Sequence, residues 1–217
     1  MYIFIIFNML KKYQLLHSKG KARVFTKKEA DDFCGYNTQI ILDLMIQNKL
    51  ISRVKRGLYY IHHFGEEEIE SDWTIFLPYL SDTGYVGYWS AIDRDSNTMY
   101  LVETRKNRLE EEEIKDKKIV YVKNAGRFDN HGPLVKEGFL DPKMAILDCI
   151  LKPEYALSEE ALLKEAKKYK KEYKEMLDGL ALMTLTPELQ AIEDAYTTEQ
   201  WDKLKLYLLQ EVINKKE

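Results

Sequence analysis

The chain has 217 residues, of which 45% are hydrophobic and 32% are charged, and its formal net charge is −3 at pH 7. This composition is ordinary for a soluble globular protein of one or two domains. Cys34 and Cys149 are the only cysteines, and neither belongs to a CxxC pair. They argue against a disulfide framework or a zinc finger, and they favour a reducing, cytoplasmic location.

A hydrophobic run covers residues 1–7. It is far too short to cross a bilayer, which needs roughly 20 residues. It also lacks the basic flank and the small-residue cleavage site of a signal peptide. We therefore expect no membrane association, and we interpret the run as an extension of the first helix, or Met9 as the natural start.

Charge is distributed unevenly along the chain. Residues 1–63 hold 11 basic and 4 acidic side chains, a net charge of +7, whereas the remainder holds 22 basic and 32 acidic side chains, a net charge of −10. Such asymmetry indicates that the basic part binds a polyanion and that the acidic part serves solubility or protein contacts. DNA is therefore the first partner to consider.

Two helices are expected at the start of the basic part. The first has its hydrophobic residues at helical spacing and ends at Gly20. The second begins at a capping box, in which the Thr26 hydroxyl and the Glu29 carboxylate satisfy each other's backbone donors. It runs to about Cys34. Its expected buried residues are Ala30 and Phe33.

A third helix follows a turn at Gly35 and Tyr36. Asn37 is its expected N-cap, because an asparagine side chain can accept from the first free amides of a helix. The residues expected to face the core are Ile40, Ile41, Leu44 and Met45. The residues expected to face outward are Thr38, Gln39, Asp43 and Gln47. We interpret this helix as the recognition helix of a helix-turn-helix.

Residues 51–61 have the pattern of an apolar hairpin with a basic tip, and Gly57 relaxes the backbone of its turn. The residues expected to pack inward are Ile51, Val54, Leu58 and Ile61. The residues expected to stay outside are Arg53, Lys55 and Arg56. Helices followed by such a hairpin are typical of a winged helix-turn-helix domain, which we place at residues 1–64.

The candidate DNA contacts follow from this arrangement. The N-terminal end of a recognition helix points at base edges in the major groove, where asparagine and glutamine can bind adenine. Lysines at the start of the preceding helix can bind phosphate together with the free amides of that helix, and an arginine at the wing tip suits a minor groove or a phosphate. The candidate DNA-binding residues are Lys27, Lys28, Tyr36, Asn37, Thr38, Gln39, Arg53, Lys55 and Arg56. The alternatives are ordinary solvated charges on a small helical domain and a winged helix that binds only protein.

The acidic part, residues 65–217, has the pattern of a mixed domain in which strands come first. An apolar, helix-like run covers 73–80, and we expect Pro78 to kink it. Residues 98–104 and 118–122 are expected strands separated by charged turns.

The last third of the chain is expected to be helical from Pro142 onward, so the overall fold class is α+β. The residues expected on one face of the first of these helices are Met144, Ile146, Leu147 and Ile150. Long helices rich in lysine and glutamate follow.

Three motifs carry a resemblance to a known family. They are Lys55-Arg56-Gly57-Leu58-Tyr59, Gly87-Tyr88-Trp89-Ser90-Ala91 and Asp141-Pro142-Lys143-Met144-Ala145-Ile146-Leu147-Asp148. On these motifs, from about Gly20 to about Leu182, the chain resembles the AbiEi family of antitoxins and transcriptional regulators of type IV toxin–antitoxin systems. The resemblance implies a winged-helix domain that represses its own operon. It also implies a C-terminal domain that counteracts a nucleotidyltransferase-like toxin.

The chain departs from the family pattern after Ala91. Family members commonly continue with a short helix and a histidine-glycine-leucine step, whereas residues 92–97 here lead straight to an expected strand. This departure bears on the antitoxin role more than on DNA binding. Residues 183–217 lie beyond the resemblance, and we interpret them as an added helical cap or an oligomerisation element.

One pair of carboxylates has the spacing of an enzyme site. Asp93 and Asp95 are spaced like the magnesium-binding pair of nucleotidyltransferases. The neighbouring Arg94 and Ser96 are polar, however, and this favours a loop over a catalytic strand.

The other titratable groups also favour structural roles. At the pair His62 and His63 we expect one imidazole to face phosphate and the other to pack. The four glutamates at 110–113 are expected to start a solvated helix, and Cys149 is expected to be a buried thiol rather than a nucleophile. We therefore expect no enzyme activity, no metal and no cofactor.

Two functions follow from the sequence. The first is a DNA-binding transcriptional autoregulator that acts as the antitoxin of a two-gene module, with its own promoter and a nucleotidyltransferase-like toxin as partners. The second is a stand-alone winged-helix transcription factor whose C-terminal domain dimerises or senses a ligand. A metal-dependent enzyme that uses Asp93 and Asp95 is the third and weakest alternative.

Overall fold

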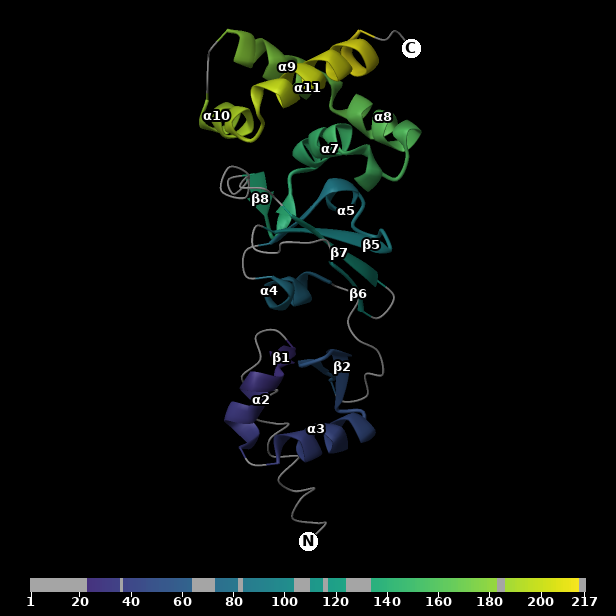
Figure 1. Ribbon diagram of the computed structural model, residues 1–217, viewed down its shortest axis with the longest axis vertical. Coiled ribbons are helices and arrows are strands. Elements are labelled where there is room, and N and C mark those ends of the chain that lie inside the picture. The colour runs from purple at the N-terminus through teal and green to yellow at the C-terminus, as the bar shows by residue number, and fades with distance from the viewer. Residues whose placement is uncertain are drawn as a thin grey trace. The chain divides into compact units, whose positions relative to one another are not determined.

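A computed structural model describes residues 23–35, 37–63, 73–81, 84–103, 110–114, 117–123, 134–182 and 186–214. The chain forms two compact units, Met1–Asp82 and Thr83–Glu217. Both contain helices and a β-sheet (Figure 1), so the protein belongs to the mixed α+β class.

The N-terminal unit combines a helix pair with a three-stranded antiparallel sheet of order β1-β3-β2. Its first elements are β1 (Val24–Thr26), α2 (Lys27–Cys34), α3 (Thr38–Gln47), β2 (Ile51–Lys55) and β3 (Leu58–Ile61). The predicted second and third helices and the hairpin are therefore confirmed. The expected helix that ends at Gly20 lies outside the described residues.

The start of α2 has the predicted capping box. The Thr26 hydroxyl accepts from the Glu29 amide at 3.2 Å, and the Glu29 carboxylate accepts from the Thr26 amide at 2.6 Å. Two donors at the helix start are thereby satisfied. Ala30 is fully buried, as predicted.

The buried face of α3 differs from the prediction at three positions, which are Ile40, Leu42 and Thr38, and the expectation that Thr38 faces outward was wrong. Ile40 is 56% exposed, whereas Leu42 is fully buried together with Thr38 and Met45. An α-helix turns by about 100° per residue, so Ile40 points roughly 200° away from Leu42. The placement of Ile40 in the core was therefore wrong, because the packing of α3 on the hairpin selects the stripe that runs through Leu42.

Asn37 occupies the N-cap position of α3 but makes no side-chain hydrogen bond to the helix start. The expected capping role is therefore not observed. Its backbone lies in the left-handed region with φ 75°, and asparagine adopts this conformation more readily than most residues do. The residue type is thus explained by the sharp turn between α2 and α3.

Strand β3 is buried on both faces, which explains its unbroken run of apolar residues. On one face Tyr59 stacks on Phe25 with ring centroids 5.4 Å apart, and this cluster includes Leu42. On the opposite face Tyr60 meets Phe76 at 6.3 Å. The sheet therefore lies between α2 and α3 on one side and the segment that contains Phe76 on the other.

That segment consists of a 3-10 turn, η1 (Trp73–Phe76), and a short helix, α4 (Leu77–Leu80). Pro78 lies in the first turn of α4, where a missing amide costs little, so it begins a helix rather than kinking one as predicted. The Tyr79 hydroxyl donates to the Val24 carbonyl at 2.9 Å. This bond fastens α4 to β1 within the N-terminal unit.

The C-terminal unit contains a six-stranded mixed sheet of order β6-β7-β5-β4-β9-β8. The two predicted strands are confirmed as β5 and β7, which pair in parallel. The strands are β4 (Tyr85–Gly87), β5 (Thr98–Glu103), β6 (Glu110–Ile114), β7 (Lys117–Lys123), β8 (Val135–Lys136) and β9 (Phe139–Leu140).

The four glutamates of 110–113 form most of β6, so the expectation of a helix start there was wrong. β6 pairs antiparallel with β7 and lies at the edge of the sheet. Glu111 forms a 2.9 Å ion pair with Lys118, and the Tyr121 hydroxyl donates to Glu112. Pairing with an apolar neighbour therefore overrides the local helix preference, and the charges protect the exposed edge from further strand pairing.

The motif at residues 87–91 has a packing role. A Cβ on Gly87 would lie 2.8 Å from Cγ2 of Val102, so only glycine fits beside β5. The chain then turns into a short helix, α5 (Tyr88–Ile92), whose aromatic residues are buried. The Ser90 hydroxyl donates to the Gly87 carbonyl and accepts from the Tyr100 amide, both at 2.9 Å.

Helix α7 (Pro142–Leu151) forms the centre of the C-terminal unit, with α5 and the sheet on one side and the later helices on the other (Figure 1). All residues from Met144 to Cys149 are buried, so α7 is covered all round rather than on the single predicted face. The other helical elements are η3 (Pro153–Tyr155), α8 (Glu159–Lys168), α9 (Lys170–Ala181), α10 (Pro187–Asp194), α11 (Thr198–Tyr207) and a π-helical segment, η4 (Leu208–Ile213).

The C-terminal tail belongs to the same core. Trp201, Leu204, Leu208 and Val212 are buried in the cluster that also contains α7. Residues 186–214 thus form a helical cap on this core, and the oligomerisation role stays a prediction.

Candidate nucleic-acid interface

One backbone hydrogen bond joins the two basic segments of the N-terminal unit. The Lys27 amide, at the start of α2, donates to the Gly57 carbonyl in the hairpin turn at 2.8 Å. The pairing of Thr26 with Leu58 in the β1–β3 ladder fixes this contact. Four basic residues thereby come together, which we name the basic ridge: Lys27, Lys28, Lys55 and Arg56.

The ridge presents its charges to solvent. Lys27, Lys28 and Arg56 are exposed, and Lys55 is half-buried. Arg56 and Gly57 form the turn between β2 and β3, and Gly57 has a φ of 80°, which favours glycine. A β-bulge between Arg53 and Lys55 adds a local bend to the hairpin just before this turn.

The amides at the start of α2 are less available than expected. The Lys27 amide is used by Gly57, and the Glu29 amide is used by the capping box. The Glu29 carboxylate also adds negative charge at this helix end. Phosphate binding at the ridge would therefore depend on the lysine and arginine side chains more than on the helix amides.

The predicted base-reading residues at the start of α3 divide into three groups. Asn37 and Gln39 are exposed and can contact an external ligand. Thr38 is only 6% exposed and its hydroxyl donates to the Gly35 carbonyl at 2.8 Å, so we leave Thr38 out of the candidate interface. Tyr36 lies outside the described residues.

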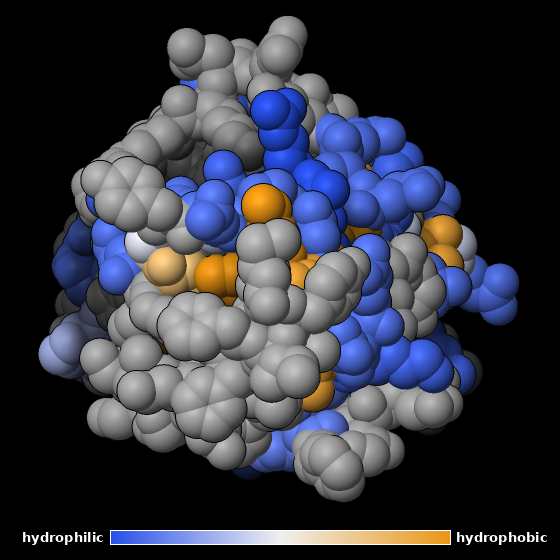
Figure 2. All heavy atoms as spheres, turned by 90° about the horizontal axis from the view of Figure 1, so that it is seen from below, coloured by the Kyte–Doolittle hydropathy of each residue, from blue (hydrophilic) through white to orange (hydrophobic). Residues whose placement is uncertain are grey.

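The outward surface of α3 is mixed in character. The side-chain amide of Gln39 donates to the Asp43 carboxylate, one helical turn further on, at 2.9 Å. Ile40 is exposed beside them. In Figure 2, which looks onto the N-terminal unit, hydrophobic atoms appear among hydrophilic side chains. Asp43 would repel a DNA backbone, so it limits how closely this helix can approach phosphate.

The remaining predicted residues lie on or next to β2 and β3. Arg53 is exposed opposite Tyr59, and this places it on the face of the sheet that packs on α2 and α3. His62 is buried and bonds to the Ser52 hydroxyl at 2.6 Å, whereas His63 is exposed. The His62 imidazole is thus packed in the interior, as predicted for one of the pair, and the His63 imidazole faces solvent.

The Asp93–Asp95 segment is a loop, as predicted. Asp93 ends α5 and accepts from the Asp95 amide at 3.2 Å. The largely buried Lys117 ammonium donates to the carbonyls of Asp95 at 3.1 Å and Ser96 at 2.5 Å, and so holds the loop to β7. Among the described residues, no three histidine, cysteine, aspartate or glutamate side chains form a group that could hold a metal ion.

Cys149 is a buried thiol, as predicted. Burial raises the pKa of this thiol well above its usual range, and the neighbouring Asp148 carboxylate raises the pKa further. The thiol therefore stays protonated at neutral pH, and a protonated thiol is a poor nucleophile.

Two features of the interface were missed by sequence reasoning. The contact between Lys27 and Gly57 depends on pairing between distant strands, although the short strand 24–26 before the capping box was a usable signal. The Gln39–Asp43 bond has the i, i+4 spacing of a helix pair and could have been found from the sequence.

The chain matches no protein-family model, and comparison with curated proteins finds no match. Within the described ranges, every helix is too short or too polar to cross a membrane.

Proposed function

We propose that the N-terminal unit binds double-stranded DNA. The observation that carries this proposal is the hydrogen bond between the Lys27 amide and the Gly57 carbonyl, which joins the helix lysines and the hairpin arginine into one ridge. Lysine and arginine side chains on phosphate supply most of the affinity of such proteins without reading sequence.

The order of elements supports a winged helix-turn-helix. A short strand, two helices and a hairpin follow one another, and the first strand pairs with the second strand of the hairpin. In such domains the second helix of the pair enters the major groove, and the wing lies on the adjacent backbone. By this analogy α3 carries the reading residues, Asn37 and Gln39, and the ridge positions the domain.

We further propose that this is a cytoplasmic autoregulator of a two-gene module, with the C-terminal unit as the antitoxin part. The support is the three-motif resemblance to AbiEi proteins. In the structure, Lys55 to Tyr59 form the turn of the β2–β3 hairpin with its flanking strand residues, residues 87–91 form the β4–α5 junction, and Asp141 caps α7. These roles are structural, so the antitoxin proposal rests on the resemblance alone.

The test is a fluorescence-anisotropy titration of the full chain with its own upstream duplex and with a scrambled duplex of equal length. We expect tighter binding to the upstream duplex at physiological salt. Equal binding of the two duplexes would reject sequence recognition.

The antitoxin role has a separate test. The gene beside this one is expressed alone and together with the full chain in a host that lacks both. Growth arrest that co-expression relieves supports the antitoxin proposal. If the product of the neighbouring gene is harmless, the stand-alone transcription factor is favoured. A cavity in the C-terminal unit supports the version of this alternative in which the C-terminal domain senses a ligand.

A further inference from the structure

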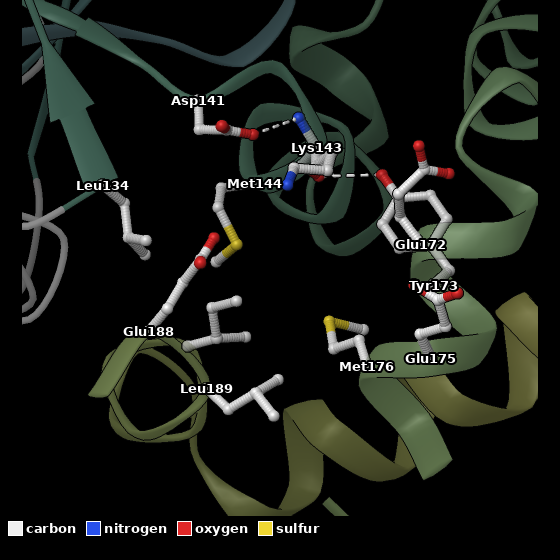
Figure 3. Close-up of a pocket in the computed structure, with 11 residues that line it drawn as sticks. Leu134, Asp141, Lys143, Met144, Glu172, Tyr173, Glu175, Met176, Glu188 and Leu189 are labelled. Atoms are coloured by element: carbon white, nitrogen blue, oxygen red, sulfur yellow. Dashed lines mark hydrogen bonds between the residues drawn. The ribbon is translucent and has the colours of Figure 1, made fainter. Parts of the chain in front are cut away.

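A cavity of about 240 Å³ opens in the C-terminal unit between the start of α7, helix α9 and helix α10 (Figure 3). None of its residues belongs to the candidate DNA interface, and the inference does not depend on DNA binding. The lining residues are Leu134, Asp141, Lys143, Met144, Glu172, Tyr173, Glu175, Met176, Glu188, Leu189 and Ile192.

The inner wall of the cavity is hydrophobic. Met144 from α7, Met176 from α9 and Ile192 from α10 are buried, with exposures of 2%, 8% and 8%. Leu189 from α10 faces the same space (Figure 3). Methionine and leucine walls favour a hydrocarbon guest, and the flexible methionines adapt to its shape.

Close packing of the two outer helices fixes this wall. A Cβ on Gly179 of α9 would lie 2.8 Å from Cδ1 of Leu189 on α10. The absence of a side chain at Gly179 therefore lets Leu189 sit against α9. The cavity is therefore bounded on this side by two closely packed helices, α9 and α10.

The rim of the cavity is acidic. It carries four carboxylates but a single lysine, Lys143. Asp141 is engaged with the Lys143 amide at 2.9 Å, and Glu175 lies 3.7 Å from Lys171. Glu172 and Glu188 form no ion pair with any described residue, and in Figure 3 Glu188 extends from α10 toward Met144.

The polar groups at the back of the cavity are already satisfied. The Tyr173 hydroxyl donates to the Lys143 carbonyl at 2.8 Å, and this bond holds α9 to the first turn of α7. The charge offered to a guest is therefore negative and lies at the mouth. A guest that suits this arrangement has a cationic end outside and a hydrocarbon body inside.

The size of the cavity narrows the class further. Sites for drug-sized ligands and cofactors span roughly 300–1,000 Å³, so a cavity of about 240 Å³ suits a smaller molecule. Nucleotides and phosphates are further disfavoured by the carboxylates. We propose that this cavity binds a short aliphatic primary amine, with its ammonium at Glu188 and its chain against Met144, Met176 and Leu189. The amine is either a free small molecule or a lysine side chain of a protein partner.

The test uses the two methionines as reporters. The full chain is labelled on its methionine methyl groups and titrated with pentylamine, with pentanol as the uncharged match, and with N-acetyl-lysine methylamide. We expect saturable shifts of Met144 and Met176 with an amine, at a dissociation constant on the order of a millimolar for so small a ligand. The methyl groups of Met45 and Met99, in other parts of the fold, are expected to stay in place.

A comparison of the two amines shows whether the natural ligand is a free small molecule or a lysine side chain of a protein. Stronger binding of pentylamine indicates a free amine, and stronger binding of the lysine derivative indicates a protein side chain. Pentanol is expected to bind at least several-fold more weakly than pentylamine. If pentanol binds as well as the amines, or if neither amine shifts Met144 and Met176, the proposal is overturned.

Surface variants then test the acidic rim. Glu188→Gln is expected to weaken amine binding roughly 1.4- to fivefold, since exposed ion pairs are worth about 0.2–1 kcal/mol. Glu193→Gln, an exposed change on the same helix outside the cavity, is the matched control. Equal effects of Glu188→Gln and Glu193→Gln would remove the assigned role of the rim.

Discussion

The amide of Lys27 and the carbonyl of Gly57 are joined by a 2.8 Å hydrogen bond, so the first residue of α2 is fixed to the tip of the hairpin. The same bond sets where the Lys27, Lys28 and Arg56 side chains leave the backbone. The basic ridge is therefore a consequence of backbone pairing, and a change in that pairing is expected to affect both stability and DNA binding.

The first prediction separates the charge of Lys27 from its amide. Lys27→Ala removes the charge and keeps the amide, whereas Lys27→Pro removes both. Proline is otherwise well tolerated at the first position of a helix. Here its ring would meet the Gly57 oxygen, so we expect Lys27→Pro to unfold more easily than Lys27→Ala by about 0.5–1.5 kcal/mol, the value of a typical hydrogen bond. Urea denaturation measures the difference, and equal stabilities would show that the bond does not hold the wing.

The second prediction concerns Asp43 on α3. Asp43→Asn removes a negative charge but keeps an acceptor for the Gln39 amide. If α3 faces DNA, the variant is expected to bind both the upstream and the scrambled duplex more tightly, by roughly two- to fivefold at physiological salt. The matched control is Asp178→Asn, an exposed change on α9. An effect no larger than that of the control argues that α3 lies away from the DNA.

The third prediction concerns the core of the C-terminal unit. The Tyr196 hydroxyl donates to the buried Asp148 carboxylate at 2.9 Å and so links the region after α10 to α7. Tyr196→Phe removes a donor from a buried carboxylate, and this is expected to lower the free energy of unfolding by about 1–3 kcal/mol. Tyr207→Phe, at a half-buried tyrosine whose hydroxyl has no buried acceptor among the described residues, is the control. Similar losses in the two variants would mean that the Asp148 contact contributes little.

The fourth prediction is alkaline destabilisation. Burial raises the pKa of Tyr173 and of Tyr196 well above the usual 10, and for Tyr196 the Asp148 carboxylate adds to the effect. In the unfolded chain both tyrosines ionise near their usual pKa, while the folded chain keeps the protons. The stabilisation is thus complete below about pH 10 and is lost as the pH rises toward the folded pKa. Urea denaturation is expected to show little change in stability from about pH 9 to about pH 10 and a fall that grows as the pH rises above about 10. If stability above about pH 10 falls no more steeply in the wild-type chain than in the variant Tyr196→Phe, this account is contradicted.

Local signals in the sequence predicted much of this fold. The capping box at Thr26 and Glu29, the glycine turn at Gly57 and the helix start at Pro142 depend on residues close together in the chain, and the structure contains all three. Such motifs are reliable because the atoms that interact are already neighbours.

The expected cap at Asn37 and the expected kink at Pro78 failed locally, whereas the other failures involved partners distant in the sequence. The glutamates of 110–113 favour a helix by themselves, but pairing with β7 makes them a strand. Ile40 and Leu42 are both apolar, and only the packing of α3 against the hairpin decides which of them is buried. The contact between Lys27 and Gly57 depends in the same way on the pairing of β1 with β3. Contacts between distant segments thus determine the parts of the fold and of the candidate site that local secondary-structure propensity does not predict.

The salt dependence of DNA binding tests the basic ridge most directly. The full chain and the triple variant Lys27→Gln, Lys28→Gln and Arg56→Gln are titrated with the upstream duplex over a salt series. A triple change of exposed lysines in the C-terminal unit, Lys164→Gln, Lys167→Gln and Lys174→Gln, has the same net charge and is the control.

Each lost phosphate contact lowers the slope of log affinity against log salt by roughly 0.9, so we expect the ridge variant to lose about 2.7 units and the control to lose almost none. A slope that is unchanged in the ridge variant, or that falls equally in the control, would contradict the proposal that this ridge holds the DNA backbone.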